Sequence, residues 1–202
     1  MIHCDYQQVQ DAHQMDMVEE CLGIPKQAAL IADKDTLSFV DCYRSPVPQR
    51  MTALEAYLEM TTDLPDWVHL YLLQRSRAMR QLGAQVTERF EAKDPQLCRP
   101  QPGEPLDFFE VREISDDRLV LVREDPVARL MLSLHFEQRR HEFRRVYAVT
   151  SVFAPGVRGK IYLLAFLPTH AKLMKTLLER VENSFAEESA QESEDVSNPN
   201  RI

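Results

Sequence analysis

Hydrophobic and polar residues alternate through much of the second half of the chain. In RLMLSLHFEQR, which begins at Arg129, the leucines and Phe136 occupy one side of an extended strand, and Ser133 and His135 occupy the other. This period of two predicts a half-buried antiparallel strand with His135 at the surface. Hairpin strands are predicted before it in DFFEVREI and RLVLVRE, and a further strand after it in EFRRVYAVTSVF. An earlier β-branched and aromatic run, TLSFVDCYR, predicts the first strand at residues 36–44.

Helical spacing appears between that first strand and the hairpin. TALEAYLEM begins with Thr52 and Glu55 in the arrangement of a capping box, so it predicts a short helix. DWVHLYLLQRSRAMRQLG predicts a second helix, from Asp66 to Gly83, because its apolar residues recur at helical spacing. Later, KIYLLAFL predicts one more buried strand, Pro168 marks a turn, and a long helix is expected beyond it. The apolar stripe of that helix consists of Met174, Leu177, Leu178, Val181 and Phe185.

This order of elements predicts an α+β fold, because two short helices follow the first strand and a long helix follows a run of antiparallel strands. It is similar to the helix-grip fold, in which a strongly curved antiparallel sheet wraps around the long C-terminal helix. Such a fold leaves a cavity between sheet and helix, for which we expect roughly 300 Å³ or more, the lower end for ligand pockets. We expect an N-terminal arm at residues 1–35, the helix-grip domain at 36–186 and an acidic disordered tail at 187–202.

The charge of the chain argues against nucleic acid as a partner. Half of the net charge of -8 lies in the tail, where five acidic residues accompany Arg201. The basic run Arg139, Arg140, Arg144 and Arg145 is neutralised by nearby acidic residues, so the body lacks the positive surface that phosphate backbones require.

The remaining composition points to a cytoplasmic protein that needs no metal or cofactor. The four cysteines, Cys4, Cys21, Cys42 and Cys98, form no C-x-x-C pair, so reduced structural thiols are expected. The sequence contains no HExxH motif and no histidine cluster, so it does not predict a metal site. The N-terminus lacks the pattern of a secretory signal, and no run of about 20 apolar residues predicts a membrane span, so no membrane partner is expected.

Three segments resemble a known family when they are taken in order. VDCYR, PDWVHLYLLQR and GKIYLLAFLPTH are similar to an uncharacterised bacterial family, the domain of unknown function 2867, which is grouped with the START and pollen-allergen helix-grip superfamily. The resemblance extends from Leu37 to Phe185. It matches the family pattern at Asp41, Trp67, Arg75, Gly159, Tyr162, Pro168 and His170.

The resemblance implies a small-molecule context, because members of the family also occur fused to a reductase-like nucleotide-binding domain. It therefore suggests a reductase-like partner protein, although this chain contains no G-x-G-x-x-G motif of its own. The chain departs from the family pattern at Arg129–Ser133 and at Pro155-Gly156, where polar residues are usual. The resemblance therefore implies no activity that depends on those polar groups.

His170 has a functional and a structural interpretation. If the last helix begins at Pro168 or Thr169, His170 lies in its first turn, where the helix dipole keeps an imidazole neutral. A neutral imidazole suits a general base, but it also suits capping or packing. No nucleophile or acidic partner is evident beside it, so the structural role is favoured and no residue is assigned as catalytic.

Arg75 needs a carboxylate if it points inward, because a buried unpaired guanidinium is costly. Asp41, on the first strand, is the predicted partner in a structural ion pair. Capture of an anionic ligand by Arg75 is the alternative. Trp67 and Tyr162 are large aromatic residues that either line a cavity or fill the core.

These patterns leave three functions open. The favoured one is a module that binds a small apolar or amphipathic molecule between the sheet and the last helix. The ligand-binding candidates are then Trp67, Arg75, Tyr162, His170 and Met174. The alternatives are an enzyme of the cyclase or hydratase kind that uses His170 and Tyr162, and a ligand-free domain that binds a partner protein.

Overall fold

A computed structural model of the chain describes residues 18–81, 83, 90, 93–94, 97–138 and 143–197. Its strands form one antiparallel sheet in the order β1-β2-β7-β6-β5-β4-β3. The strands are β1 (Glu19–Glu20), β2 (Phe39–Pro46), β3 (Pro105–Leu106), β4 (Phe109–Ser115), β5 (Arg118–Glu124), β6 (Arg129–Glu137) and β7 (Arg145–Phe153). The helices are the short 3-10 helix η1 (Lys34–Thr36), α2 (Ala53–Thr61), α3 (Asp66–Arg80) and α4 (Gly156–Ser197).

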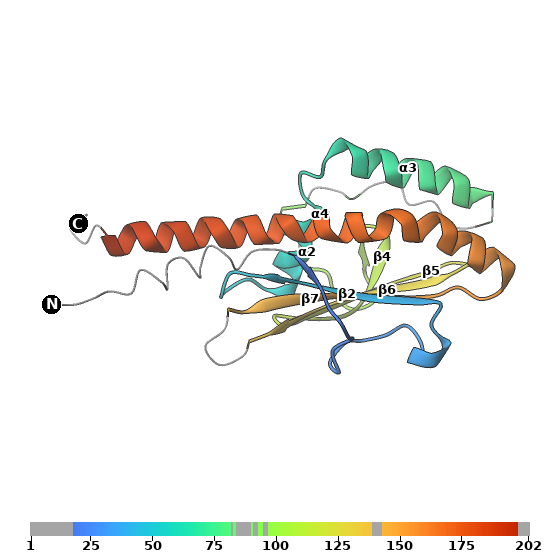
Figure 1. Cartoon of the computed structure of the whole chain (residues 1–202), viewed down its shortest axis with the longest axis horizontal. Coiled ribbons are helices and arrows are strands. Elements are labelled where there is room, and N and C mark those ends of the chain that lie inside the picture. Colours follow the sequence, from blue (N-terminus) through green and yellow to red (C-terminus); the bar gives the residue numbers. More distant parts are fainter. Residues whose placement is uncertain are drawn as a thin grey trace.

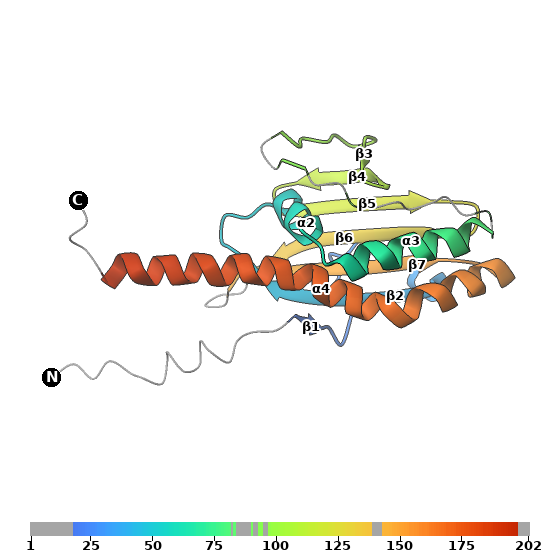
Figure 2. The same cartoon turned by 90° about the horizontal axis from the view of Figure 1, so that it is seen from above.

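The α+β helix-grip prediction is confirmed. The sheet is curved, and α4 lies across its inner face, with α3 beside α4 and α2 at one end (Figures 1 and 2). The two short helices follow the first long strand, and the long helix ends the described chain. The inner face therefore packs against all three α-helices, and the main hydrophobic core lies between them.

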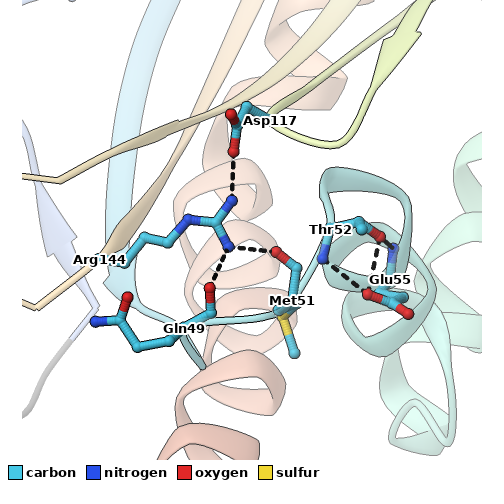
Figure 3. Close-up of polar contacts among 6 residues, drawn as sticks. All are labelled: Gln49, Met51, Thr52, Glu55, Asp117 and Arg144. Atoms are coloured by element: carbon cyan, nitrogen blue, oxygen red, sulfur yellow. Dashed lines mark hydrogen bonds and ion pairs between the residues drawn. The ribbon is translucent and has the colours of Figure 1, made fainter.

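The capping box predicted for α2 is present and fixes the start of that helix (Figure 3). Glu55 N donates to Thr52 Oγ1 at 3.2 Å, and Thr52 N donates to the Glu55 carboxylate at 2.8 Å. Arg144 holds the preceding turn, because its guanidinium donates to the carbonyl oxygens of Gln49 and Met51 and pairs with Asp117. These contacts attach α2 to the end of the sheet near the β4–β5 turn.

The predicted strand at Lys160–Leu167 is wrong, because this segment forms the first turns of α4. Pro168 lies inside the helix, which bends along its first half in Figure 2. A proline removes one helical hydrogen bond and disturbs the carbonyl four residues earlier. Here that carbonyl belongs to Leu164, whose side chain is 73% exposed. Water can therefore reach the broken turn, and the packed face of α4 continues past the proline.

Another correction concerns the outer face of the sheet. His135 was predicted at the surface, but it is 4% exposed and stacks on Tyr147, with ring centroids 5.3 Å apart. The N-terminal segment covers this face, where Ile31 packs against Val120, Val122 and Met131. A second apolar cluster joins the same segment to Cys42, Tyr147 and Val149. The strands are consequently buried on both faces.

The helix also extends further than expected at its C-terminal end. Residues 187–197 belong to α4, whereas the sequence predicts a disordered tail from Glu187 onward. Glu, Gln and Ala have favourable helix propensities, and an existing helix is extended without the cost of a new nucleus. This part of α4 runs past the end of the sheet in Figures 1 and 2.

Candidate functional site

A cavity lies between the inner face of the sheet and the three α-helices. We call it the chamber. Its walls are mostly apolar side chains from α2, α3, α4 and strands β4 to β7. They include Met60, Leu72, Phe109, Leu130, Leu132, Phe166, Leu173, Met174 and Leu177. Polar side chains enter this apolar lining from several elements: Arg75 from α3, Arg123 from β5, Thr150 from β7 and His170 from α4.

One face of α4 supplies a row of side chains to the chamber. Tyr162, Phe166, His170 and Met174 follow one another at intervals of four residues, so a helix stacks them along one side. The rings of Tyr162 and Phe166 stack with centroids 6.1 Å apart, and those of Phe166 and His170 stack at 4.4 Å. This row depends on the helical conformation of residues 160–167, since an extended strand would place neighbours at intervals of two.

His170 is paired with Asp41 rather than positioned at a helix end. It lies about four turns into α4, so the argument from the dipole of the first turn does not apply. His170 Nε2 is 2.9 Å from Asp41 Oδ2, and the two side chains are only 4% and 9% exposed. The contact has the distance of an ion pair but not the alignment of a good hydrogen bond. Asp41 Oδ1 and His170 Nδ1 have no hydrogen-bond partner among the described residues.

The predicted ion pair between Asp41 and Arg75 is not formed, because Asp41 contacts His170. Arg75 instead places its guanidinium over two aromatic rings, 4.8 Å from the centroid of Tyr162 and 5.4 Å from that of Phe166. No described carboxylate lies within 4.0 Å of it, and its buried Nε has no partner in the described part of the chain. Cation–π contacts compensate a guanidinium only in part.

Two further polar side chains of the lining, Arg123 and Tyr57, have protein partners. Arg123 is 4.0 Å from Asp125 and 5.5 Å from the centre of the Phe108 ring, and burial lowers the pKa of this guanidinium. The hydroxyl of Tyr57 donates to Asp107 at 2.6 Å, and burial raises the pKa of this phenol. Among the described residues around the chamber, the buried polar atoms without a hydrogen-bond partner belong to Arg75, His170 and the neighbouring Asp41.

The size of the chamber differs from the expectation. Its volume is about 80 Å³, below the roughly 300 Å³ predicted for a ligand pocket. Aromatic side chains of α4 and of the β3–β4 region, such as Phe166 and Phe108, occupy much of the space between sheet and helices. An apolar cavity of about 150 Å³ accepts benzene, so a smaller group fits here without rearrangement.

Four of the five predicted ligand-binding residues meet in this one place. The residues that line the chamber are Arg75, Tyr162, His170 and Met174. Trp67 is instead half-buried beside the core, and the ammonium of Lys172 lies over its ring at 4.4 Å from the centroid. Sequence reasoning missed Phe166, Thr150 and Arg123. The recurrence of Tyr162, Phe166, His170 and Met174 every fourth residue was the available signal for Phe166, and no local pattern marks the other two.

The described residues show neither a metal site nor a helix suited to cross a membrane. They contain no group of three or more His, Cys, Asp or Glu side chains arranged to hold a metal ion. Within the same residues, no helix combines the length and the apolar character that crossing a membrane requires.

Comparison with known proteins identifies the family. No curated protein and no solved structure matches the chain. A family model described as "Protein of unknown function (DUF2867)" matches residues 34–177, which include β2, all the wall residues of the chamber and the whole row of Tyr162, Phe166, His170 and Met174 on α4. The chain therefore belongs to the DUF2867 family, as the resemblance of its sequence segments predicts.

Proposed function

We propose that this protein binds a small apolar or amphipathic molecule in the chamber between the sheet and α4. The helix-grip arrangement and the family membership also support kinship with START-like domains of the cytoplasm. The observation that carries the proposal is a group of buried polar atoms that have no hydrogen-bond partner among the described residues. Arg75 Nε and His170 Nδ1 belong to residues that line an apolar cavity, and Asp41 Oδ1 lies beside His170. A buried polar atom without a partner costs about 1–3 kcal/mol, so such a cluster is more typical of a binding site than of a core.

The volume of the chamber limits the ligand. At about 80 Å³ it accommodates a short chain or a small ring substituent in its present shape. A larger ligand has to displace side chains, and partly exposed wall residues such as Leu173 and Tyr71 are the ones with room to move. We therefore expect a compact ligand, or one whose narrow end alone enters the chamber.

Native mass spectrometry of the protein purified from its own host tests this proposal. We expect a mass above that of the bare chain under gentle conditions, and the bare mass after denaturation. Thr150→Leu adds volume inside the chamber and should abolish the retained mass, whereas Thr150→Ser leaves the space open and should preserve it. Equal retention by both variants would place the bound molecule elsewhere.

A second candidate function is catalysis of proton transfer. The 2.9 Å contact between Asp41 and His170 favours it, because a carboxylate that holds one imidazole nitrogen leaves the other available as a base. The ring of Phe166 lies between Tyr162 and His170, so Asp41 is a better partner for His170 than the predicted Tyr162. Arg75 would then stabilise negative charge that develops on the substrate.

Hydrogen exchange distinguishes binding from this chemistry. A ligand incubated with the protein in heavy water should gain deuterium at a carbon if His170 abstracts a proton there. His170→Gln should stop the exchange while ligand is still retained. Retention without deuterium gain in the unchanged protein would leave binding as the function.

A further inference from the structure

We infer that the ligand of the chamber carries a single negative charge, such as a carboxylate, and that Arg75 is its anchor. This inference rests on the proposed function, and it adds the chemical class of the ligand. The apolar remainder of the ligand would lie toward Leu132 and Leu177, which line the same space.

Charge balance around the chamber supports one anion. His170 has the Asp41 carboxylate at 2.9 Å, and the Arg123 guanidinium has the Asp125 carboxylate at 4.0 Å, so each of these two side chains lies beside a carboxylate. Asp125 is held in place because it also accepts from the backbone N–H groups of Val127 and Ala128, each at 2.9 Å. Arg75 is left with aromatic rings but with no described carboxylate within 4.0 Å. One unmatched positive charge at a cavity wall complements one negative charge on a ligand.

The orientation of Arg75 also suits a carboxylate. The central carbon of the Arg75 guanidinium lies over the rings of Tyr162 and Phe166, and a guanidinium that stacks on aromatic faces keeps its N–H groups at its edge for other partners. Two of those N–H groups form parallel hydrogen bonds to a carboxylate, the geometry that arginine favours. The buried Nε, which has no described partner, is one of the donors available at that edge.

Calorimetric titration with paired probes tests this inference. The probes are butanoate, hexanoate and octanoate, each compared with the neutral alcohol of equal chain length. We expect each carboxylate to bind more tightly than its alcohol, with about a fourfold gain per methylene until the chamber is full. Arg75→Gln should weaken carboxylate binding by about ten- to a hundredfold, since a charge-assisted hydrogen bond is lost, and leave alcohol binding unchanged.

Arg77→Gln is the matched control, because Arg77 is an exposed arginine on the same helix and should not affect either probe. Equal affinities for alcohols and carboxylates in the unchanged protein would overturn the inference and leave the proposed function in place. An equal loss for both probes in Arg75→Gln would also overturn it. Absence of binding for every probe would contradict the proposed function itself.

A different part of the molecule carries a second inference. We propose that Cys21 and Cys42 form a disulfide that fastens the N-terminal segment to the sheet. The register pairs Glu19 with Arg44 and Glu20 with Tyr43, so Cys21 lies opposite Cys42, and Cys21 N donates to Cys42 O at 2.8 Å. Directly opposed residues have Cα atoms about 4.5–5.5 Å apart, within the range of about 4.4–6.8 Å that disulfides span.

The surroundings of the two thiols assign different roles to them. Cys21 is partly exposed, and a hydrogen bond from Cys42 and the nearby charge of Arg44 lower the pKa of its thiol. Cys42 is buried, and both its hydrogen bond with Cys21 and its burial raise the pKa of its thiol. A small disulfide such as oxidised glutathione supplies the oxidant. The Cys21 thiolate attacks it and releases one glutathione thiol. Cys42 then loses its proton and attacks the Cys21 sulfur, which releases the second thiol and closes the protein disulfide.

Peptide mapping after treatment with oxidised glutathione tests this proposal. We expect a linked peptide that joins Cys21 to Cys42, and the loss of two hydrogen atoms from the mass of the intact chain. Cys98→Ser should not affect the reaction, whereas Cys42→Ser should accumulate a stable glutathione adduct on Cys21. Reduced Cys21 and Cys42 in the treated protein, or a bridge to another cysteine, would overturn the proposal.

Discussion

Both faces of the sheet are covered by other parts of the chain, but their buried polar groups are satisfied to different degrees. On the outer face, backbone N–H groups of the N-terminal segment form hydrogen bonds with serine hydroxyls of the sheet. Ile31 N donates to Ser151 Oγ at 3.0 Å, and Ala29 N donates to Ser133 Oγ at 3.3 Å. On the inner face, the neighbouring residue Thr150 lies in a wall of the chamber, and its hydroxyl donates to the sulfur of Met174 at 3.9 Å.

This difference separates architecture from function. A surface that has only to hold the fold together satisfies its hydrogen bonds and leaves little space. The inner face keeps a cavity and several unmatched polar atoms, which lowers stability unless a ligand compensates them. His135 is an exception on the outer face, because both of its ring nitrogens are buried without a hydrogen-bond partner in the described residues. Arg118 Nε and Arg145 Nε, on the same face, also lack such a partner there, but each guanidinium lies within 4.0 Å of a glutamate carboxylate.

The largest change in stability is expected from a substitution that loosens the N-terminal segment from the outer face. Ile31→Ala should lower the free energy of unfolding by about 2–4 kcal/mol, because the side chain is 9% exposed and packs between Val120 and Met131. Urea denaturation followed by circular dichroism measures this loss. A change below about 1 kcal/mol, smaller than a buried isoleucine truncation gives, would show that the segment contributes little to the outer face.

Neighbouring hydroxyls on opposite faces provide a direct comparison. Ser151→Ala should cost about 1–3 kcal/mol, because it leaves the buried N–H of Ile31 without an acceptor. Thr150→Val removes a hydroxyl whose partner is a weak sulfur acceptor, so it should change stability by less than about 0.5 kcal/mol. Equal costs in thermal or urea unfolding would remove the distinction between the two faces.

Arg75 should behave as a functional residue in stability measurements. Arg75→Met removes an unmatched charge and keeps packing against Tyr162 and Phe166, so unfolding free energy should stay constant or rise by about 1 kcal/mol. The substitution should at the same time weaken carboxylate binding. A substantial loss of stability in the ligand-free protein would identify Arg75 as a structural residue.

The smallest expected effect is the contribution of His135 to the pH dependence of stability. Burial lowers the pKa of this histidine from its ordinary value of 6.5, so the folded state binds a proton less readily than the unfolded chain. The stability associated with neutral His135 is complete above 6.5 and is lost as the pH falls toward the lowered folded-state pKa. His135→Phe keeps a ring against Tyr147 and should reduce the fall in thermal midpoint between pH 7 and pH 5. An identical fall in both proteins would show that other groups cause it.

The sequence predicts most of the fold because most elements have strong local signals. The alternation around Leu132 and the capping box at Thr52 each specify an element without reference to the rest of the chain. The first turns of α4 have the local pattern of a strand, because a short apolar run fits either structure and a proline such as Pro168 normally ends a helix. The segment is helical because this conformation places both Tyr162 and Phe166 against the chamber.

The candidate site was predictable in its residue types more than in its pairings. The chamber brings together four of the predicted residues, Arg75, Tyr162, His170 and Met174. Asp41, however, contacts His170 and not the predicted Arg75. Such a choice depends on the curvature of the sheet and on where α4 crosses β2, which no local pattern specifies. The burial of His135 was missed for the same reason, since the segment that covers it comes from a distant, largely polar part of the chain.

Methionine methyl groups report on both faces in one experiment. Met60 and Met174 line the chamber, and Met131 is buried on the outer face. In a protein labelled at its methionine methyl groups, titration with hexanoate should shift the resonances of Met60 and Met174 to saturation and leave Met131 unchanged. The same resonances should respond less to hexanol. Resonances of Met60 and Met174 that stay fixed throughout the titration, or that move no more than Met131, would contradict binding in the chamber.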